Sequence, residues 1–158
     1  EIKGVVVTKD TPRSQSIVKE VFNDLNQYMK NGILLRQVVN VIDEIDFSDA
    51  EDRHTFGDIY EGILKDLQSA GNAGEFYTPR ALTDFIVEKV DPCLGEKVAD
   101  FACGTGGFLV SALKHLTAKV QTPEDLQMCR GNLFGIEKKS FPYSLCMTNL
   151  ILHEVAEP

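Results

Sequence analysis

The chain has 158 residues, of which 43% are hydrophobic and 25% charged, so it is large enough for one cored domain and too apolar for a disordered chain. Lysine and arginine total 16 against 24 aspartate and glutamate residues, which gives a net charge of -8. A chain of this sign is repelled on balance by DNA phosphates, so any grip on a duplex has to come from elsewhere.

The four cysteines are not arranged as zinc ligands, and the sequence contains neither a signal peptide nor a long apolar span. These features predict a cytoplasmic protein with no membrane contact and no metal site. The chain begins with Glu1 instead of methionine and stops at Pro158 without a closing helix. We therefore expect a piece of a longer protein.

Three stretches within residues 1–70 repeat apolar side chains at steps of three and four residues, which is typical of amphipathic helices. They cover residues 17–28, 33–45 and 56–67. Asn31 and Gly32 are expected to end the first helix in a left-handed conformation. The acidic run 43–52 is interpreted as a solvated loop. Residues 1–70 are thus predicted to form a helical N-terminal domain.

A second domain is predicted from residue 71 to 158, and it opens with a helix. Thr78 followed by Pro79 is the pattern of an N-cap with proline at the first helical position. The helix is expected to end at Asp91-Pro92. The residues predicted to form its buried face are Leu82, Phe85, Ile86 and Val90.

Beyond this helix, the pattern changes to alternating strands and helices. A short strand at 97–101 leads through the glycine turn 103–107 into a helix from Phe108. An insert at 119–130, with a helix starting near Thr122, precedes a second strand at 132–137. Ser140, Phe141 and Pro142 are predicted to cap a last helix that runs to about Leu152. This order predicts a parallel sheet in an α/β fold.

A glycine turn between a strand and a helix lets the backbone approach a ligand at the carboxyl ends of the strands. A Walker phosphate loop would place a lysine after the glycines, and none follows here. A dinucleotide fingerprint would need its third glycine at position 109, which is Leu109. The turn therefore fits neither of these two phosphate-binding motifs.

Residues 100–108, Asp-Phe-Ala-Cys-Gly-Thr-Gly-Gly-Phe, resemble the Asp-Pro-x-x-Gly-Thr-Gly-Gly-Phe loop with which amino-group DNA methyltransferases hold S-adenosylmethionine. Phe101 stands where the family usually has proline. Residues 74–80, Gly-Glu-Phe-Tyr-Thr-Pro-Arg, are similar to the segment that precedes this loop in the modification (M) subunits of type I restriction-modification systems. The resemblance covers residues 56–158.

The resemblance implies a Rossmann-like S-adenosylmethionine-dependent methyltransferase domain preceded by a helical segment. Glu137, at the end of the second strand, suits the two ribose hydroxyls of an adenosine. The resemblance also implies that Asp100 meets the methionine part, and that residues 74–80 close over the cofactor. The expected cofactor-binding residues are Glu75, Phe76, Tyr77, Thr78, Pro79, Arg80, Asp100, Gly104, Thr105, Gly106, Gly107, Phe108 and Glu137.

Each of these residues also has a simpler structural interpretation. Asp100 could cap the turn that follows it, and Glu137 could be an exposed strand-end acid. Phe76 and Tyr77 could pack into the core, and Cys103 is interpreted as a small filler beside the loop. The histidines have no paired acid or cysteine, so no catalytic role is assigned to them.

The implied reaction transfers a methyl group from S-adenosylmethionine to adenine N6, on a base that has been rotated out of the duplex. The family's catalytic motif, Asn-Pro-Pro-Phe, is absent from these 158 residues, so the chain alone is expected to have no turnover and no catalytic residues. By the same resemblance, the intact protein would work with a specificity subunit and a restriction subunit and would meet double-stranded DNA through that complex. A single-chain restriction-methylation enzyme and a non-catalytic nucleotide-binding module remain alternatives.

Overall fold

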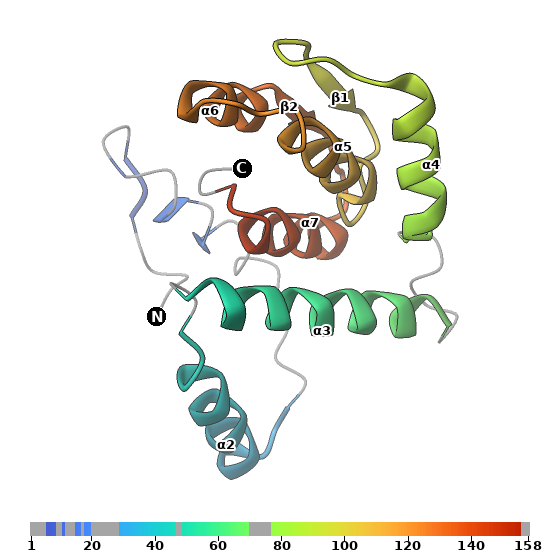
Figure 1. Cartoon of the computed structure of the whole chain (residues 1–158). Helices are drawn as coiled ribbons and strands as arrows, with labels where there is room; N and C mark the ends of the chain where they lie inside the picture. Colours follow the sequence, from blue (N-terminus) through green and yellow to red (C-terminus); the bar gives the residue numbers. More distant parts are fainter. Residues whose placement is uncertain are drawn as a thin grey trace.

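The computed structural model describes residues 6–8, 11, 15–16, 18–19, 29–46, 49–69 and 77–155. The elements named in Figure 1 are α2 (Gly32–Asp43), α3 (Ala50–Ser69), α4 (Arg80–Val90), β1 (Val98–Asp100), α5 (Gly107–Thr117), α6 (Pro123–Gly131), β2 (Leu133–Gly135) and α7 (Ser140–Leu152). The helix predicted at 17–28 lies mostly outside the described residues. None of the helices in the described ranges is long and apolar enough to span a membrane.

The two strands form a parallel sheet, as the sequence predicts. Val98 pairs with Leu133 and Asp100 with Gly135. Helix α5 supplies more of the core cluster than any other element, through Leu109, Val110, Leu113 and Leu116, and α6 and α7 pack on it. The predicted α/β fold is therefore confirmed, with α6 inserted between the two strand-helix units.

Helix α3 lies along α7 on the side away from the sheet (Figure 1). The buried Tyr60 hydroxyl donates a hydrogen bond to the Leu145 carbonyl at 2.9 Å, and Leu64 is 1% exposed. Burial raises the pKa of Tyr60, which keeps its hydroxyl protonated as the donor. Helix α3 thus packs directly on the α/β part, and the domain boundary predicted at residue 70 stays a prediction.

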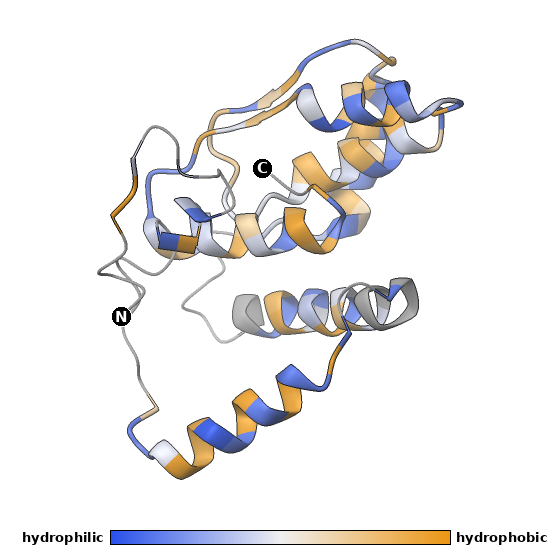
Figure 2. Ribbon diagram, turned by 90° about the vertical axis from the view of Figure 1, so that its left-hand side faces the viewer, coloured by the Kyte–Doolittle hydropathy of each residue, from blue (hydrophilic) through white to orange (hydrophobic). Residues whose placement is uncertain are grey.

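Helix α2 has an apolar and a polar stripe, but none of its residues is buried (Figure 2). The expected left-handed stop before it is wrong. Asn31 is extended, with φ −85°, and its Oδ1 accepts hydrogen bonds from the backbone N–H groups of Ile33 and Leu34. Asn31 is thus the N-cap of α2, because a short amide side chain satisfies the free donors of a helix start. The acidic loop is also shorter than predicted, since α3 begins at Ala50.

The buried face predicted for α4 is wrong. Its apolar residues are exposed, from 37% at Ile86 to 72% at Val90, whereas Thr83 and Val87 are buried. Thr83 Oγ1 lies 2.8 Å from Ser111 Oγ on α5, in a hydrogen bond that removes both hydroxyls from water. This polar contact lies on the face of α4 that meets α5, and apolar periodicity alone does not reveal it.

Two predicted helix caps are each displaced by one residue. The N-cap of α4 is Pro79, with ψ 134°, and no side chain caps the helix, so Thr78 lies outside it. The N-cap of α7 is Lys139 instead of Ser140. In contrast, Thr122 caps α6 in a reciprocal capping box with Asp125, and Asp91 closes α4 with φ 51°.

Candidate functional site

The carboxyl ends of β1 and β2 bring the two predicted acidic residues to one edge of the sheet. Asp100 is the last residue of β1, and Glu137 follows β2 by two residues. Backbone hydrogen bonds between the two segments continue past the ends of the strands. The Ile136 N–H donates to the Asp100 carbonyl at 2.9 Å, and the Cys103 N–H donates to the Ile136 carbonyl at 3.0 Å. Both acids therefore flank the start of the glycine turn.

The glycine turn adopts a conformation that only glycine takes without strain at two positions. Gly104 has φ 55° and Gly106 has φ 82°, both in the left-handed region. The Thr105 carbonyl between them accepts a hydrogen bond from the fully buried Asn149 side chain of α7 at 3.1 Å. A rigid helix thus holds the turn from beneath.

Glu137 holds the same turn from the strand side. Its Oε2 accepts a hydrogen bond from the Gly104 N–H at 3.0 Å, and its Oε1 accepts one from the Lys139 N–H at 2.7 Å. A carboxylate has about four lone-pair sites, so each oxygen can accept one further donor. Glu137 is therefore more than an exposed strand-end acid, because it joins β2 to the turn after β1.

Asp100 shows the capping contact that its simpler interpretation predicts. Its Oδ1 accepts a hydrogen bond from the Ala102 N–H at 3.1 Å. The residue is partly exposed and also lines the pocket described next, so capping the turn does not remove its carboxylate from that pocket.

A pocket of about 370 Å³ lies between the glycine turn, the strand ends and the segment that enters α4. Its volume falls in the range of about 300–1,000 Å³ that small-molecule sites occupy. Its charged groups are two carboxylates and one ammonium. The lining residues are Tyr77, Thr78, Asp100, Ala102, Cys103, Gly104, Gly107, Phe108, Glu137 and Lys139.

The pocket thus brings together seven of the thirteen residues selected from the sequence. Partial burial, with Glu61 nearby, raises the pKa of Tyr77 and keeps its hydroxyl protonated. Thr105 and Gly106 are buried within the turn and do not line the pocket, and Pro79 is exposed outside it. Glu75 and Phe76 lie outside the described residues.

Arg80 also does not line the pocket. Its Nε donates a hydrogen bond to Glu61 Oε2 of α3 at 2.9 Å, and its Nη2 bonds the other Glu61 oxygen. Its Nη1 lies so close to the turn that a Cβ on Gly107 would be 2.7 Å away. The guanidinium therefore connects α3 to the start of α5.

Three residues of the pocket lining were not predicted from the sequence: Ala102, Cys103 and Lys139. Cys103 also lines a neighbouring cavity of about 260 Å³, in which its sulfur lies near that of Cys146. The Glu-Lys-Lys sequence after β2 could have indicated Lys139, since Glu137 itself was selected. Nothing local indicates that Cys103 meets a residue 43 positions further along the chain.

The fold and the pocket define an α/β domain of the Rossmann-like class, with a glycine turn and two acids at the strand ends. A family model described as N-6 DNA Methylase matches residues 51–158. The chain belongs to this N-6 DNA methylase family.

Individual proteins agree with the family match. The type I restriction enzyme EcoEI methylase subunit of Escherichia coli is 57% identical over 158 residues, which cover 99% of this chain and 32% of that subunit. A crystal structure assigned to a type I restriction enzyme modification subunit of Vibrio vulnificus is 42% identical with a TM-score of 0.75, and covers 98% of this chain.

A second solved structure, described in terms of complex assembly and conformational transition of the type I R-M system, has a TM-score of 0.87 at 35% identity. It covers 99% of this chain. The chain spans 32% of the length of each of these three proteins.

Proposed function

We propose that the chain forms the S-adenosylmethionine-binding part of an adenine-N6 DNA methyltransferase subunit of a type I restriction-modification system. The observation that carries the proposal is the position of Asp100 and Glu137, which flank one glycine turn in a single pocket. The high identity to a type I methylase subunit along nearly the whole chain favours a type I parent over a single-chain enzyme.

The residues of the pocket fit this cofactor. S-adenosylmethionine carries a cationic ammonium and two ribose hydroxyls, and it has no phosphate. Two carboxylates with one ammonium suit such a ligand better than a polyphosphate. Gly104 lines the pocket with backbone alone, and Phe108 offers apolar surface. In this arrangement, Asp100 receives the ammonium and the remaining lone pairs of Glu137 receive the ribose hydroxyls.

The part played by this chain is binding and orientation. The bound cofactor supplies a methyl group activated on its sulfonium. The residues that turn the adenine amine toward that methyl group belong, by the family resemblance, to an Asn-Pro-Pro-Phe motif that these 158 residues lack. We therefore expect the chain to bind the cofactor and to transfer no methyl group.

The proposal extends to the partners of the intact protein. A specificity subunit would read the DNA target and a restriction subunit would cleave, so double-stranded DNA would be met through the assembled complex. One of the solved relatives is described in terms of complex assembly of the type I R-M system, which supports a multisubunit arrangement.

The test compares thermal unfolding of the chain with S-adenosylhomocysteine, with NAD and without ligand. The proposal predicts that S-adenosylhomocysteine raises the melting temperature, because a ligand that binds only the folded state stabilises it, and that NAD does not. A shift with NAD alone would favour an oxidoreductase. No shift with either would favour a non-catalytic module of the same fold.

Glu137→Ala alone does not separate ribose binding from support of Gly104, because Glu137 contacts both the turn and the pocket. The variant is therefore compared with wild type on S-adenosylhomocysteine and on its 2′-deoxy analogue. A ribose contact predicts that the substitution weakens binding of S-adenosylhomocysteine by about tenfold or more and that of the analogue much less. Equal losses would mean that Glu137 acts only through the turn.

A further inference from the structure

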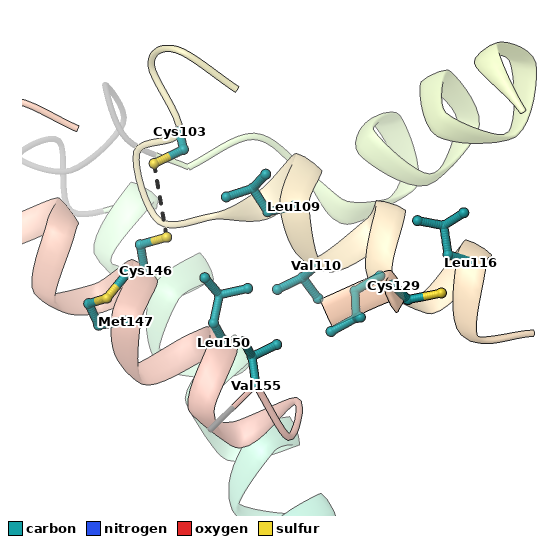
Figure 3. Packing of buried hydrophobic residues seen from close by; sticks show 10 residues of the cluster. Cys103, Leu109, Val110, Leu116, Cys129, Cys146, Met147, Leu150 and Val155 are labelled. Atoms are coloured by element: carbon teal, nitrogen blue, oxygen red, sulfur yellow. Dashed lines mark hydrogen bonds between the residues drawn. The ribbon is translucent and has the colours of Figure 1, made fainter. Parts of the chain in front are cut away.

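Two buried cysteines from distant parts of the chain face each other beneath the glycine turn. Cys103 opens the turn and Cys146 lies on α7, with their sulfur atoms 4.0 Å apart (Figure 3). Their exposed fractions are 7% and 1%. Both are free thiols, so the contact joins two reduced sulfur atoms that are separated by 43 positions in the sequence.

The surrounding backbone holds the two sulfur atoms in this position. A Cβ on Gly106 would lie 2.7 Å from the Cys146 sulfur, and a Cβ on Gly135 would lie 3.0 Å from the Cys103 sulfur. Neither glycine can therefore take a side chain without displacing a thiol. The pair lies between the turn, β2 and α7.

The thiols differ in how readily they lose a proton. The hydrogen bond with Cys146 lowers the pKa of Cys103, against the opposing effects of burial and of the nearby Asp100 and Glu137. The same hydrogen bond, together with burial, raises the pKa of Cys146. Of the two thiols, Cys103 therefore has the lower pKa and is the one that loses its proton more readily.

Cys103 is also the one that small molecules can reach. It lines both the pocket of about 370 Å³ at the strand ends and the adjoining cavity of about 260 Å³, whereas Cys146 lines only the second. A peroxide is small enough to enter either space. Cys103 is therefore accessible to a peroxide from the two spaces that it lines, and its sulfur is also in contact with the sulfur of Cys146.

We propose that Cys103 and Cys146 form an oxidative modification site, in which a peroxide converts the two thiols into a disulfide that fastens the glycine turn to α7. The Cys103 thiolate attacks a peroxide oxygen, so that an S–O bond forms, the O–O bond breaks and hydroxide leaves as water after taking a proton. The Cys146 sulfur then displaces hydroxide from the sulfenic acid, and the released hydroxide takes the Cys146 proton. Two thiols and one peroxide give one disulfide and two waters.

Disulfide formation changes the shape of the turn. A disulfide bond is about 2.05 Å long, so the two sulfur atoms must approach by about 2 Å. Cys103 precedes Gly104, whose N–H donates to Glu137. Movement of Cys103 toward α7 therefore disturbs the contact between the turn and Glu137. The expected consequence, which rests on the proposed function, is weaker binding of the nucleoside cofactor.

The test treats the folded full chain with hydrogen peroxide, blocks the remaining thiols and maps the peptides by mass spectrometry. The expected result is a Cys103–Cys146 crosslink that dithiothreitol reverses, with Cys93 and Cys129 blocked as free thiols. Cys129→Ser is the matched control, because Cys129 is also buried in this core but lies apart from the pair (Figure 3), and it should leave the crosslink intact. Cys146→Ser should abolish the crosslink.

Failure of the folded wild-type chain to form this crosslink, or equal yields of crosslinks through Cys93 or Cys129, would overturn the proposal. Titration with S-adenosylhomocysteine then separates the two inferences. Oxidised chain should bind at least about tenfold more weakly than reduced chain. Equal affinities would overturn the effect on the turn, whereas absent binding in the reduced chain would overturn the proposed function and leave the crosslink standing.

Discussion

At the scale of single residues, the choice of glycine in the turn depends on how closely the turn packs against α7. Gly106 combines φ 82° with a position against the Cys146 sulfur, so it has both a conformational and a steric requirement for glycine. The second glycine of the Asp-x-x-x-Gly-x-Gly pattern is therefore required by close packing on α7 as well as by backbone conformation.

Gly106→Ala is expected to lower the free energy of unfolding by at least about 2 kcal/mol. The reason is that the energetic cost of a left-handed φ for alanine adds to the cost of a clash between its Cβ and the buried Cys146 sulfur. Denaturant unfolding measures the change. Gly131→Ala is the control, since a Cβ at that helix end would meet nothing within 4 Å, and it should change stability by less than about 1 kcal/mol. Similar losses in both variants would contradict this account of the turn.

At the scale of the elements, the sequence predicts those features that depend on near neighbours. Helix α6 begins where Thr122 and Asp125 can form a capping box, and α4 ends where Asp91 takes the left-handed conformation. Parallel strands place their carboxyl ends together, which is why Asp100 and Glu137 could be assigned to one site before the structure was known.

The features that could not be predicted depend on contacts between distant residues. The face of α4 that meets α5 contains the Thr83–Ser111 hydrogen bond, which joins residues 28 positions apart, and the apolar side is exposed. The direction of Arg80 follows from Glu61 on α3, a helix that the sequence analysis placed in a separate domain. The partners of Thr83 and Arg80, which are Ser111 and Glu61, lie outside the local sequence pattern of α4. Apolar periodicity therefore predicted a helix correctly but assigned the wrong buried face to it.

The pair between Glu61 and Arg80 predicts that α3 unfolds together with the α/β part. The two side chains are only 20% and 18% exposed, so their attraction is less screened than that of a surface pair. A double-mutant cycle with Glu61→Gln and Arg80→Gln, followed by denaturant unfolding, should give a coupling of about 1–3 kcal/mol.

The exposed pair of Glu88 and Lys89 on α4 is the control for this cycle. Its side chains are 66% and 61% exposed, and the corresponding coupling should be below about 0.5 kcal/mol. Equal couplings for both pairs would contradict a stabilising role of the Glu61–Arg80 pair. A separate unfolding transition for α3 would show that α3 is an independent unit and would support a domain boundary near residue 70.

At the scale of the whole molecule, charge separates cofactor binding from DNA binding. With 16 basic against 24 acidic residues, phosphate contacts by this chain would have to overcome a net charge of -8. A pocket with two carboxylates at the strand ends adds to the negative charge on the face where the cofactor would lie. Such a face does not repel a nucleoside without phosphates, whereas it repels the phosphates of a duplex, so basic groups outside this chain would have to hold the duplex near the cofactor.

The chain alone is therefore expected to bind duplex DNA more weakly than about 100 µM at about 150 mM salt, the weak end of non-specific protein–DNA affinities. Fluorescence anisotropy of a labelled duplex measures this, with S-adenosylhomocysteine binding by the same preparation as the control that the chain is folded. Addition of the specificity subunit should produce binding that weakens steeply as salt rises, because its basic groups would then displace the counterions of the duplex. Tight, salt-dependent binding by the chain alone would show that a local basic surface outweighs the net charge, and DNA contact could no longer be assigned to the partner subunits.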